Sequence, residues 1–195
     1  MMIVITGTPG TGKTTVTNIL KSKIDAMFIS INSLLDDYDL NRGTDEKRGY
    51  KIVDTEKMIP IVDSIKKDNV DKDIIFEGHL AQDYPNADLV IVLRCRPDIL
   101  EDRLNTRHWK QEKVNENVSA EILGVCTSES YDTYGEDVQE IDTSSCDACE
   151  IADIIVKIMK KEVVYPLGEI DFLEDYFELL WIIHIIHVCS LKPII

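Results

Sequence analysis

The sequence lacks several features that would place it in a specialised class of protein. Its five cysteines are an odd number spread over 195 residues, which does not fit the even framework of a small disulfide-rich domain. We find no internal repeat, no low-complexity segment, and no N-terminal basic region followed by an apolar stretch and a cleavage site. We therefore expect an intracellular, cytoplasmic protein with one domain and small insertions.

Basic residues are also scarce, since 21 Lys and Arg stand against 36 Asp and Glu and the formal net charge is −15. An acidic surface repels phosphate backbones at long range, which argues against direct binding of nucleic acid. The same charge favours encounter with a strongly basic protein.

The tail from 170 to 191 is apolar but too short for a membrane span. Its uncharged part, 179–191, has only about 13 residues, whereas a spanning helix needs about 20. We expect a helix that docks on the domain or on a partner; the alternatives are a disordered or aggregation-prone end and, least favoured, a membrane helix.

Strand and helix patterns alternate along the chain. Apolar runs predict strands at 2–6, 27–31, 73–77, 88–93 and 138–142. Helical spacing follows at 13–21, from 54 onward, and at 97–107, 118–125 and 146–160. This order predicts an α/β fold with a five-stranded parallel sheet and helices on both faces. The polar segment 36–51 has no apolar period and is expected to be a mobile insertion.

The strongest motif is Gly7-Thr8-Pro9-Gly10-Thr11-Gly12-Lys13-Thr14, which fits G-x-x-x-x-G-K-[ST] between a predicted strand and a predicted helix. In such a loop, backbone amides and the helix N-terminus converge on phosphate oxygens. Lys13 can bridge the β- and γ-phosphates, and the Thr14 hydroxyl can coordinate Mg²⁺. We predict a phosphate-binding loop (P-loop) for a nucleoside triphosphate.

Glu77 and His79, at and just after the end of the predicted strand 73–77, are candidates for the same site. Glu77 stands at the carboxyl end of a predicted strand, where ligands gather in open α/β sheets, and is our candidate for the carboxylate that phosphoryl transfer needs near the Mg²⁺. The alternative is a solvated residue at a strand end. His79 could orient water or a phosphate acceptor, or it could be an ordinary hydrogen-bonding residue.

A basic cluster stands out in this acidic chain at 103–110. Phosphoryl transfer needs cations that neutralise charge in the transition state, and a closing lid commonly supplies them. Arg107 is the first choice for this lid cation, with Arg94, Arg103 and Lys110 behind it. The alternative is that these side chains pair with the acidic surface.

Cys146-x-x-Cys149 is a single cysteine pair, and a structural zinc site would need two further ligands. His184, His187 and Cys189 could in principle supply them, although histidines three residues apart on an apolar helix are usually packing residues. The expected metal is therefore Mg²⁺, at Thr14 and Glu77.

Three segments, GTPGTGKTT, EGHLAQ and VLRCRPDILEDRLNTRHWKQEKVNENVSAEI, together resemble the adenylate kinase isoenzyme 6 type family, the coilin-interacting nuclear ATPase and its archaeal relatives. The resemblance covers about residues 2–160, and the tail YPLGEIDFLEDYFELL looks like the archaeal branch. It implies a P-loop nucleoside monophosphate (NMP) kinase domain at 1–165, with an NMP-binding insertion at about 32–53, a lid at about 107–117, and a helical tail at 166–195.

The resemblance also implies an activity. It is Mg²⁺-dependent transfer of the ATP γ-phosphate to AMP, giving two ADP, with accompanying ATPase activity and a part in small ribosomal subunit maturation through a basic ribosomal protein. Glu77 stands where the family usually has Asp, and the loop 142–144 lies where such kinases hold adenine. The implied catalytic residues are Lys13, Glu77, His79 and Arg107. The implied nucleotide-binding residues are Gly10, Thr11, Gly12, Lys13, Thr14, Thr15, Arg107 and Thr143.

One departure concerns the acceptor side. Where the family often has an arginine, this chain has Asp36 and Asp37, which should repel the AMP phosphate unless Arg42, Lys47 or Arg48 replaces the missing cation. Two alternatives therefore stay open beside the adenylate kinase. One is an ATP-switched ribosome assembly factor with little kinase activity, acting as a monomer or bound to its partner. The other is a kinase for another small metabolite.

Overall fold

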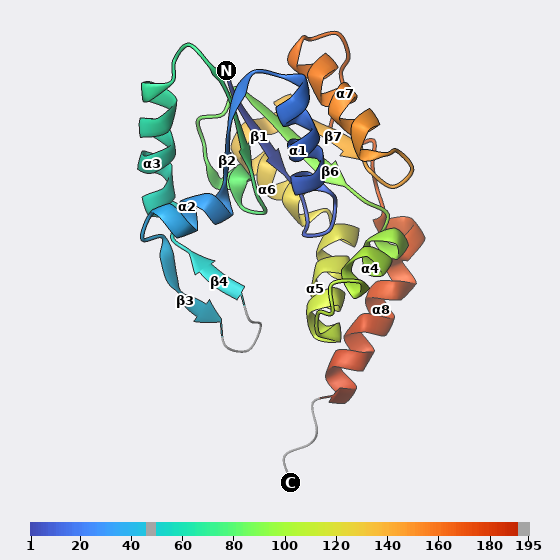
Figure 1. Cartoon of the computed structure of the whole chain (residues 1–195). Helices are drawn as coiled ribbons and strands as arrows, with labels where there is room; N and C mark the ends of the chain where they lie inside the picture. Colours follow the sequence, from blue (N-terminus) through green and yellow to red (C-terminus); the bar gives the residue numbers. More distant parts are fainter. Residues whose placement is uncertain (46–49, 191–195) are drawn as a thin grey trace.

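A parallel sheet forms the centre of the computed structural model (Figure 1), which describes residues 1–45 and 50–190, with only the backbone described at 45, 50 and 184–190. Its strands are β1 (Met2–Thr6), β2 (Ala26–Ser30), β5 (Asp73–Glu77), β6 (Leu89–Arg94) and β7 (Val138–Asp142). They run in the order β2-β5-β1-β6-β7, and every neighbouring pair is parallel. The predicted α/β fold with five parallel strands is confirmed.

Helices cover both faces of the sheet. One face carries α1 (Lys13–Lys23) and α7 (Ala148–Met159), and the other carries α2 (Ile31–Asp37), α3 (Thr55–Asp68) and α6 (Val125–Tyr134). The alternation of side chains along β1 explains both cores, because Ile3 and Ile5 face α1 and α7 while Met2 and Val4 face the opposite layer. Two single turns, η1 (Ala81–Asp83) and η2 (Gly135–Asp137), complete the connections.

Three further helices form a lobe beyond the carboxyl edge of the sheet. They are α4 (Pro97–Asn105), α5 (Gln111–Ile122) and α8 (Leu173–Ser190), and we call them the α4–α5–α8 lobe. Leu100 and Val118 belong to its apolar cluster, and Leu180 of α8 packs against them. The tail is thus a helix docked on its own domain, the first of the predicted arrangements.

The predicted helix at 118–125 was wrong in its bounds. The chain ends α5 at Ile122 and starts a separate helix, α6, at Val125. Gly124 lies between them with φ +62° and ψ 35°, a left-handed conformation that turns the backbone out of one helix and into the next.

The polar insertion contains regular structure that was not predicted. β3 (Asn41–Asp45) and β4 (Tyr50–Val53) pair antiparallel after α2, and we call these three elements the α2–β4 arm. The side chains from 41 to 44 are exposed, so no apolar alternation signals the strand. Lys47 and Arg48 lie outside the described residues.

Within the described part of the chain, none of the helices combines the length and the apolar character that crossing a bilayer requires.

Candidate functional site

The P-loop connects β1 to α1 at the carboxyl edge of the sheet. Gly7 has φ +137°, and a Cβ atom there would stand 2.3 Å from the carbonyl oxygen of Leu93 on the neighbouring strand. Because only glycine fits so close to that backbone, the loop can start its turn directly from the central strand. Gly12, with φ +98°, then precedes the first turn of α1 without capping it through a side chain. The N–H groups of that turn are therefore available to phosphate oxygens.

Lys13 folds back over the loop and is almost fully buried. Its Nζ donates to the carbonyl oxygens of Gly7 at 2.6 Å and of Thr8 at 3.0 Å. Burial lowers the pKa of Lys13, and the Arg107 guanidinium adds to this, while the Glu77 and Glu121 carboxylates act in the opposite direction. An ammonium group is thus held at the centre of the P-loop.

Thr14 and Glu77 face each other beside the P-loop, as predicted from their positions in the sequence. The Thr14 hydroxyl lies 3.4 Å from both carboxylate oxygens of Glu77. Burial raises the pKa of Glu77, and the Lys13 ammonium opposes this shift. Mg²⁺ prefers oxygen ligands and keeps several waters, so one hydroxyl and one carboxylate supplemented by phosphates form a donor set that fits this ion.

His79 lies on the loop after β5, next to a buried thiol. Its Nδ1 is 3.6 Å from Sγ of Cys126. Burial raises the pKa of Cys126 to about 12, which keeps the thiol protonated. Although the His79 residue is exposed, the protein around its ring and the Lys13 ammonium lower its pKa below the ordinary value of 6.5. The imidazole is therefore neutral near pH 7.

A pocket of about 550 Å³ opens on the other side of the P-loop, between α1, α4 and the loop after β7. Its volume lies in the range of sites for small molecules and cofactors. It brings together six of the predicted nucleotide-binding residues, namely Gly10, Thr11, Gly12, Thr15, Arg107 and Thr143. Lys13 and Thr14 directly follow Gly12 in the chain. The residues predicted to bind the phosphates and those predicted to bind the nucleoside therefore form one continuous region.

Thr143 has a more structural position than predicted. Its side chain is buried, and its hydroxyl lies 3.0 Å from the Thr11 carbonyl oxygen and 2.9 Å from that of Arg94. Arg103 donates from Nη2 to the Thr143 carbonyl oxygen at 2.8 Å. Thr143 thus ties the loop after β7 to the P-loop, and it forms part of the pocket wall through this contact.

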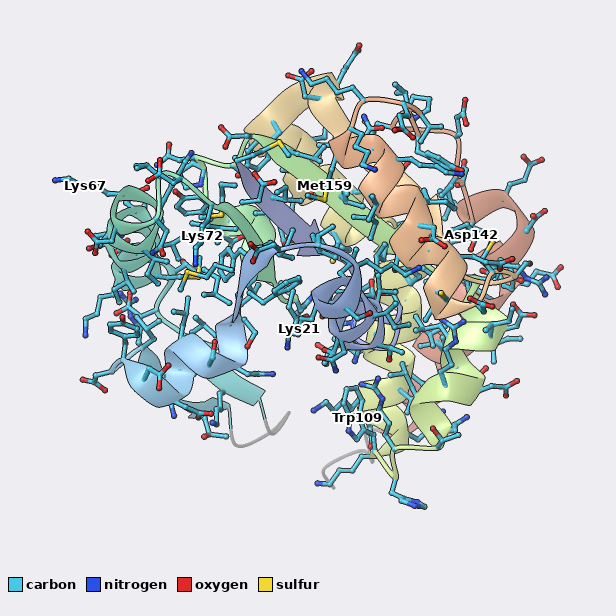
Figure 2. All side chains as sticks on the ribbon, turned by 45° about the horizontal axis from the view of Figure 1, so that its top comes forward. Lys21, Lys67, Lys72, Trp109, Asp142 and Met159 are labelled. Carbon is cyan, nitrogen blue, oxygen red and sulfur yellow. The ribbon has the colours of Figure 1, made fainter. Side chains whose placement is uncertain are left out.

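The four predicted lid cations have different environments. Arg107 is exposed at the end of α4, and its guanidinium carbon lies 5.5 Å from the ring centre of Trp109, which Figure 2 shows at the end of the lobe away from the sheet. Arg103 lines the pocket and holds Thr143, as described above, and Lys110 is exposed at the start of α5. Arg107 is therefore an exposed cation at the mouth of the pocket, as the lid hypothesis requires.

The prediction that Arg94 is a candidate lid cation was wrong. It is only 2% exposed and forms ion pairs at 2.8 Å with both Glu121 and Glu140. It also lies 5.1 Å from the ring centre of Phe172, in the segment before α8. A buried, doubly paired guanidinium cannot swing toward a transferring phosphate without leaving two buried carboxylates unpaired.

The α2–β4 arm places carboxylates around its described cations. Arg42 pairs with Asp54 through two contacts of 2.7 and 2.8 Å, and it approaches Glu56 at 3.6 Å. Lys51 lies 3.9 Å from Asp36, one of the two acids at the position of the expected arginine. Arg42 is thus held by Asp54 at the start of α3, and the proposed replacements Lys47 and Arg48 lie outside the described residues.

The cysteine pair does not assemble a metal site in the described part of the chain. Cys146 and Cys149 are exposed, and among the side chains that the structure describes no group of three or more His, Cys, Asp or Glu gathers to hold a metal ion. The further ligands considered for zinc, His184, His187 and Cys189, have side chains outside the described residues.

Two residues beside the predicted site were not among its candidate residues: Glu121, which lies outside the P-loop motif, and Thr8, which lies within it. Thr8 donates its hydroxyl hydrogen bond to the Glu121 carboxylate, and both residues are 1% exposed. A signal for Glu121 was available in the sequence, because it falls on the apolar face of α5 with Val114 and Val118. Glutamate is almost never fully buried unless it is paired, so an acid at such a position indicates a buried partner.

Comparisons with known proteins show the family of the chain. Residues 3–124, which contain the P-loop, Glu77, His79 and Arg107, match a family model described as an AAA domain. A relative from Methanocaldococcus jannaschii is 39% identical over 180 residues, covering 92% of this chain and 97% of its own. One from Methanothermobacter thermautotrophicus is 40% identical over 171 residues, covering 88% and 96%. Both carry the name "Putative adenylate kinase".

Solved structures show the same fold at low sequence identity. Shikimate kinase from Acinetobacter baumannii aligns with a TM-score of 0.58 at 13% identity, covering 83% of this chain and 93% of its own. Deoxyadenosine kinase from M. mycoides aligns with a TM-score of 0.54 at 18% identity, covering 83% and 100%. The chain therefore belongs to the AAA-domain family and, with its archaeal relatives, to the adenylate kinase family of P-loop enzymes.

Proposed function

We propose that the protein is a Mg²⁺-dependent adenylate kinase of the isoenzyme 6 type, which transfers the γ-phosphoryl group of ATP to AMP and also hydrolyses ATP. The observation that carries this proposal is the joined arrangement of Lys13, Thr14 and Glu77 with the 550 Å³ pocket beside them. A triphosphate on the P-loop amides can place its nucleoside in that pocket, next to Arg107 and Thr143. The names of the archaeal relatives support the same assignment.

The donor site would work chiefly by positioning and charge. Lys13 would exchange the carbonyl oxygens of Gly7 and Thr8 for phosphate oxygens, and Arg107 would turn from Trp109 toward the transferring group. Thr14 and Glu77 would hold Mg²⁺, which when bound neutralises charge on the β- and γ-phosphate oxygens. An oxygen of the AMP phosphate then bonds to the γ-phosphorus as the bond to the bridging oxygen breaks, leaving ADP.

His79 would orient the acceptor in this scheme. The protonated thiol of Cys126 can donate to Nδ1, which places the ring proton of the neutral imidazole on Nε2. That N–H can then donate to an oxygen of the acceptor phosphate or to a water molecule. Because the pKa of His79 is lowered, the imidazole is neutral near pH 7, and a neutral ring can fill this role.

The test is ADP formation from ATP with and without AMP, in the presence of Mg²⁺. We expect AMP to stimulate ADP formation well above the rate of ATP hydrolysis alone. Steady hydrolysis with no response to AMP would contradict the kinase assignment. A panel of other nucleoside monophosphates and small hydroxylated metabolites in the same assay addresses the alternative acceptor, since P-loop kinases share the donor site and differ at the acceptor.

A second candidate is an ATP-switched assembly factor that binds a basic small-subunit ribosomal protein. It is favoured by the net charge of −15 and by the arm, where Arg42 and Lys51 already lie against Asp54 and Asp36. For this candidate, the purified protein should co-elute with such a ribosomal protein at physiological salt, and ATP should change the amount retained. No binding to a panel of basic ribosomal proteins would count against it.

A further inference from the structure

A buried hydrogen bond joins the P-loop to α5. The Thr8 hydroxyl donates to Oε2 of Glu121, near the C-terminal end of that helix. The other carboxylate oxygen of Glu121 accepts from Nε of Arg94 at 2.8 Å and from the Cys95 amide at 3.0 Å. One carboxylate oxygen of Glu121 is therefore fixed by residues at the end of β6, and the other oxygen holds Thr8.

Thr8 in turn sets the position of the P-loop lysine. Its carbonyl oxygen accepts from Nζ of Lys13 at 3.0 Å and from the Thr11 amide at 3.2 Å. The Thr11 hydroxyl also lies 3.0 Å from this oxygen. A rotation of the Thr8 residue would move the carbonyl on which both Lys13 and the turn of the loop depend.

We propose that Glu121 is a positioning residue of the donor site, which holds the P-loop through Thr8 so that the loop amides are directed at the triphosphate and Lys13 stays at the centre of the loop until it exchanges the carbonyl oxygens of Gly7 and Thr8 for phosphate oxygens. Glu121 acts through Thr8 and is itself almost fully buried, so it is not a catalytic residue. Because it belongs to α5, the same contact joins the α4–α5–α8 lobe to the P-loop. The inference rests on the proposed nucleotide-binding function of that loop.

Charge supports this assignment. Arg94 carries one positive charge between two buried carboxylates, Glu121 and Glu140. The Glu121 carboxylate is thus held by an ion pair with Arg94 while its second oxygen stays on the Thr8 hydroxyl.

The experiment compares three threonine variants by ATP affinity and thermal unfolding. Thr8→Val removes the hydroxyl and keeps the volume, and Thr8→Ser restores the hydroxyl. Thr127→Val is a matched control, because the Thr127 hydroxyl belongs to the same cluster, donating at 2.6 Å to Glu140 and accepting from Nη1 of Arg94 at 3.1 Å, whereas the Thr8 hydroxyl belongs to the P-loop. We expect Thr8→Val to raise the Kd for ATP about tenfold. Thr8→Ser should bind ATP with a Kd within about twofold of that of wild type. This is a much smaller change than the tenfold loss, which corresponds to about 1.4 kcal/mol.

The control separates positioning from packing. Thr127→Val should lower the unfolding temperature as Thr8→Val does, yet leave the Kd for ATP unchanged. If Thr8→Val binds ATP as tightly as wild type while it loses stability, the contact only packs the protein and the inference is overturned. If wild type itself does not bind ATP, the proposed function fails and the inference fails with it.

Glu121→Gln provides a second route if Thr8→Val does not fold. Its amide oxygen can stay on Arg94 and Cys95, while an amide nitrogen replaces the oxygen that accepts from Thr8 and the charge is lost, and we expect a weaker affinity for ATP, by about three- to tenfold. In a double-mutant cycle, Thr8→Val should add less than about twofold in the Glu121→Gln background, because the two changes break one connection. Additive effects on the Kd would contradict a shared path.

Discussion

The side of the site proposed for the phosphoryl donor and the side proposed for the acceptor are built differently. On the donor side, Thr8 of the P-loop, Glu121 and Arg94 form a buried set in which every residue is at most 2% exposed. The apolar cluster of the α4–α5–α8 lobe also supports the P-loop. On the side proposed for the acceptor, the α2–β4 arm has exposed side chains from 41 to 44, and Arg42 is exposed over about half of its side chain although its partner Asp54 is only 3% exposed. Fully buried polar networks specify one arrangement, whereas ion pairs with an exposed partner constrain the chain less.

This difference indicates where specificity is decided. A triphosphate presents the same phosphates to every P-loop enzyme, so its site can be rigid and preorganised. An acceptor differs from one kinase to another, and segments with few buried contacts open at a lower free-energy cost than the core. We therefore expect substitutions on the donor side to change turnover strongly, and those on the arm to change stability and acceptor affinity.

The largest expected effect is that of Lys13→Ala. Removing the ammonium group takes a preorganised cation from the phosphates, and we expect turnover to fall by at least about 10²- to 10³-fold, with a weaker affinity for ATP. Steady-state kinetics and calorimetric titration with ATP measure the two effects. Lys66→Ala is the control, since Lys66 on α3 pairs with Asp88 away from the P-loop. Retained turnover in Lys13→Ala would remove the P-loop from the proposed mechanism.

Glu77→Gln should lower activity without lowering stability. Burial raises the folded-state pKa of Glu77 above its usual value, so the ionised carboxylate opposes folding at neutral pH, and this cost disappears as pH falls through that pKa. The variant should lose about 10²-fold in turnover because the proposed Mg²⁺ site loses the negative charge of one of its ligands. Its unfolding temperature at pH 7 should equal or exceed that of wild type, with the difference shrinking toward pH 4.5. A large loss of stability at pH 7 would show a mainly structural role for this carboxylate.

Arg42→Ala tests the arm, and its effect depends on pH. Arg42 holds the pKa of Asp54 below its usual value, so the stabilisation by this pair is present at neutral pH and is lost as pH falls through the lowered pKa. The variant should unfold at a lower temperature between pH 5 and 8, and match wild type in strong acid. Its KM for AMP should change little. A KM raised tenfold or more would mean that Arg42 leaves Asp54 to bind the acceptor.

Tyr176→Phe should have the smallest effect. The Tyr176 hydroxyl donates to Asp98 at 2.8 Å and connects α8 to the start of α4. Because the pair lies near the surface, its loss should cost only about 0.5–1 kcal/mol of stability, with unchanged kinetics. Thermal unfolding and the ADP assay give both values, and Tyr38→Phe on the arm is the control. A changed kcat would show that the position of α8 reaches the site.

Most of the sheet and the P-loop were predictable because their signals are local. The apolar runs that become β1, β5 and β6 are contiguous, and the P-loop motif sets its own turn through Gly7. Glu77 was found because a strand end has a known place in a parallel sheet. The β3–β4 strands were missed because exposed polar strands lack an apolar period, and α6 was missed because the predicted helix at 118–125 runs across Gly124 and ends where α6 begins.

The sequence by itself determined that β1, the P-loop and α1 form a phosphate-binding unit, because glycine conformation and the helix N-terminus act within a few residues. It also determined the acidic charge of the surface. Only the tertiary structure decided that Arg94 is a buried partner of Glu121 and Glu140 and not a lid cation, and that Thr8 is held from α5. Those roles depend on side chains up to 113 positions apart, and burial, which makes such pairs strong and specific, exists only when the chain is folded.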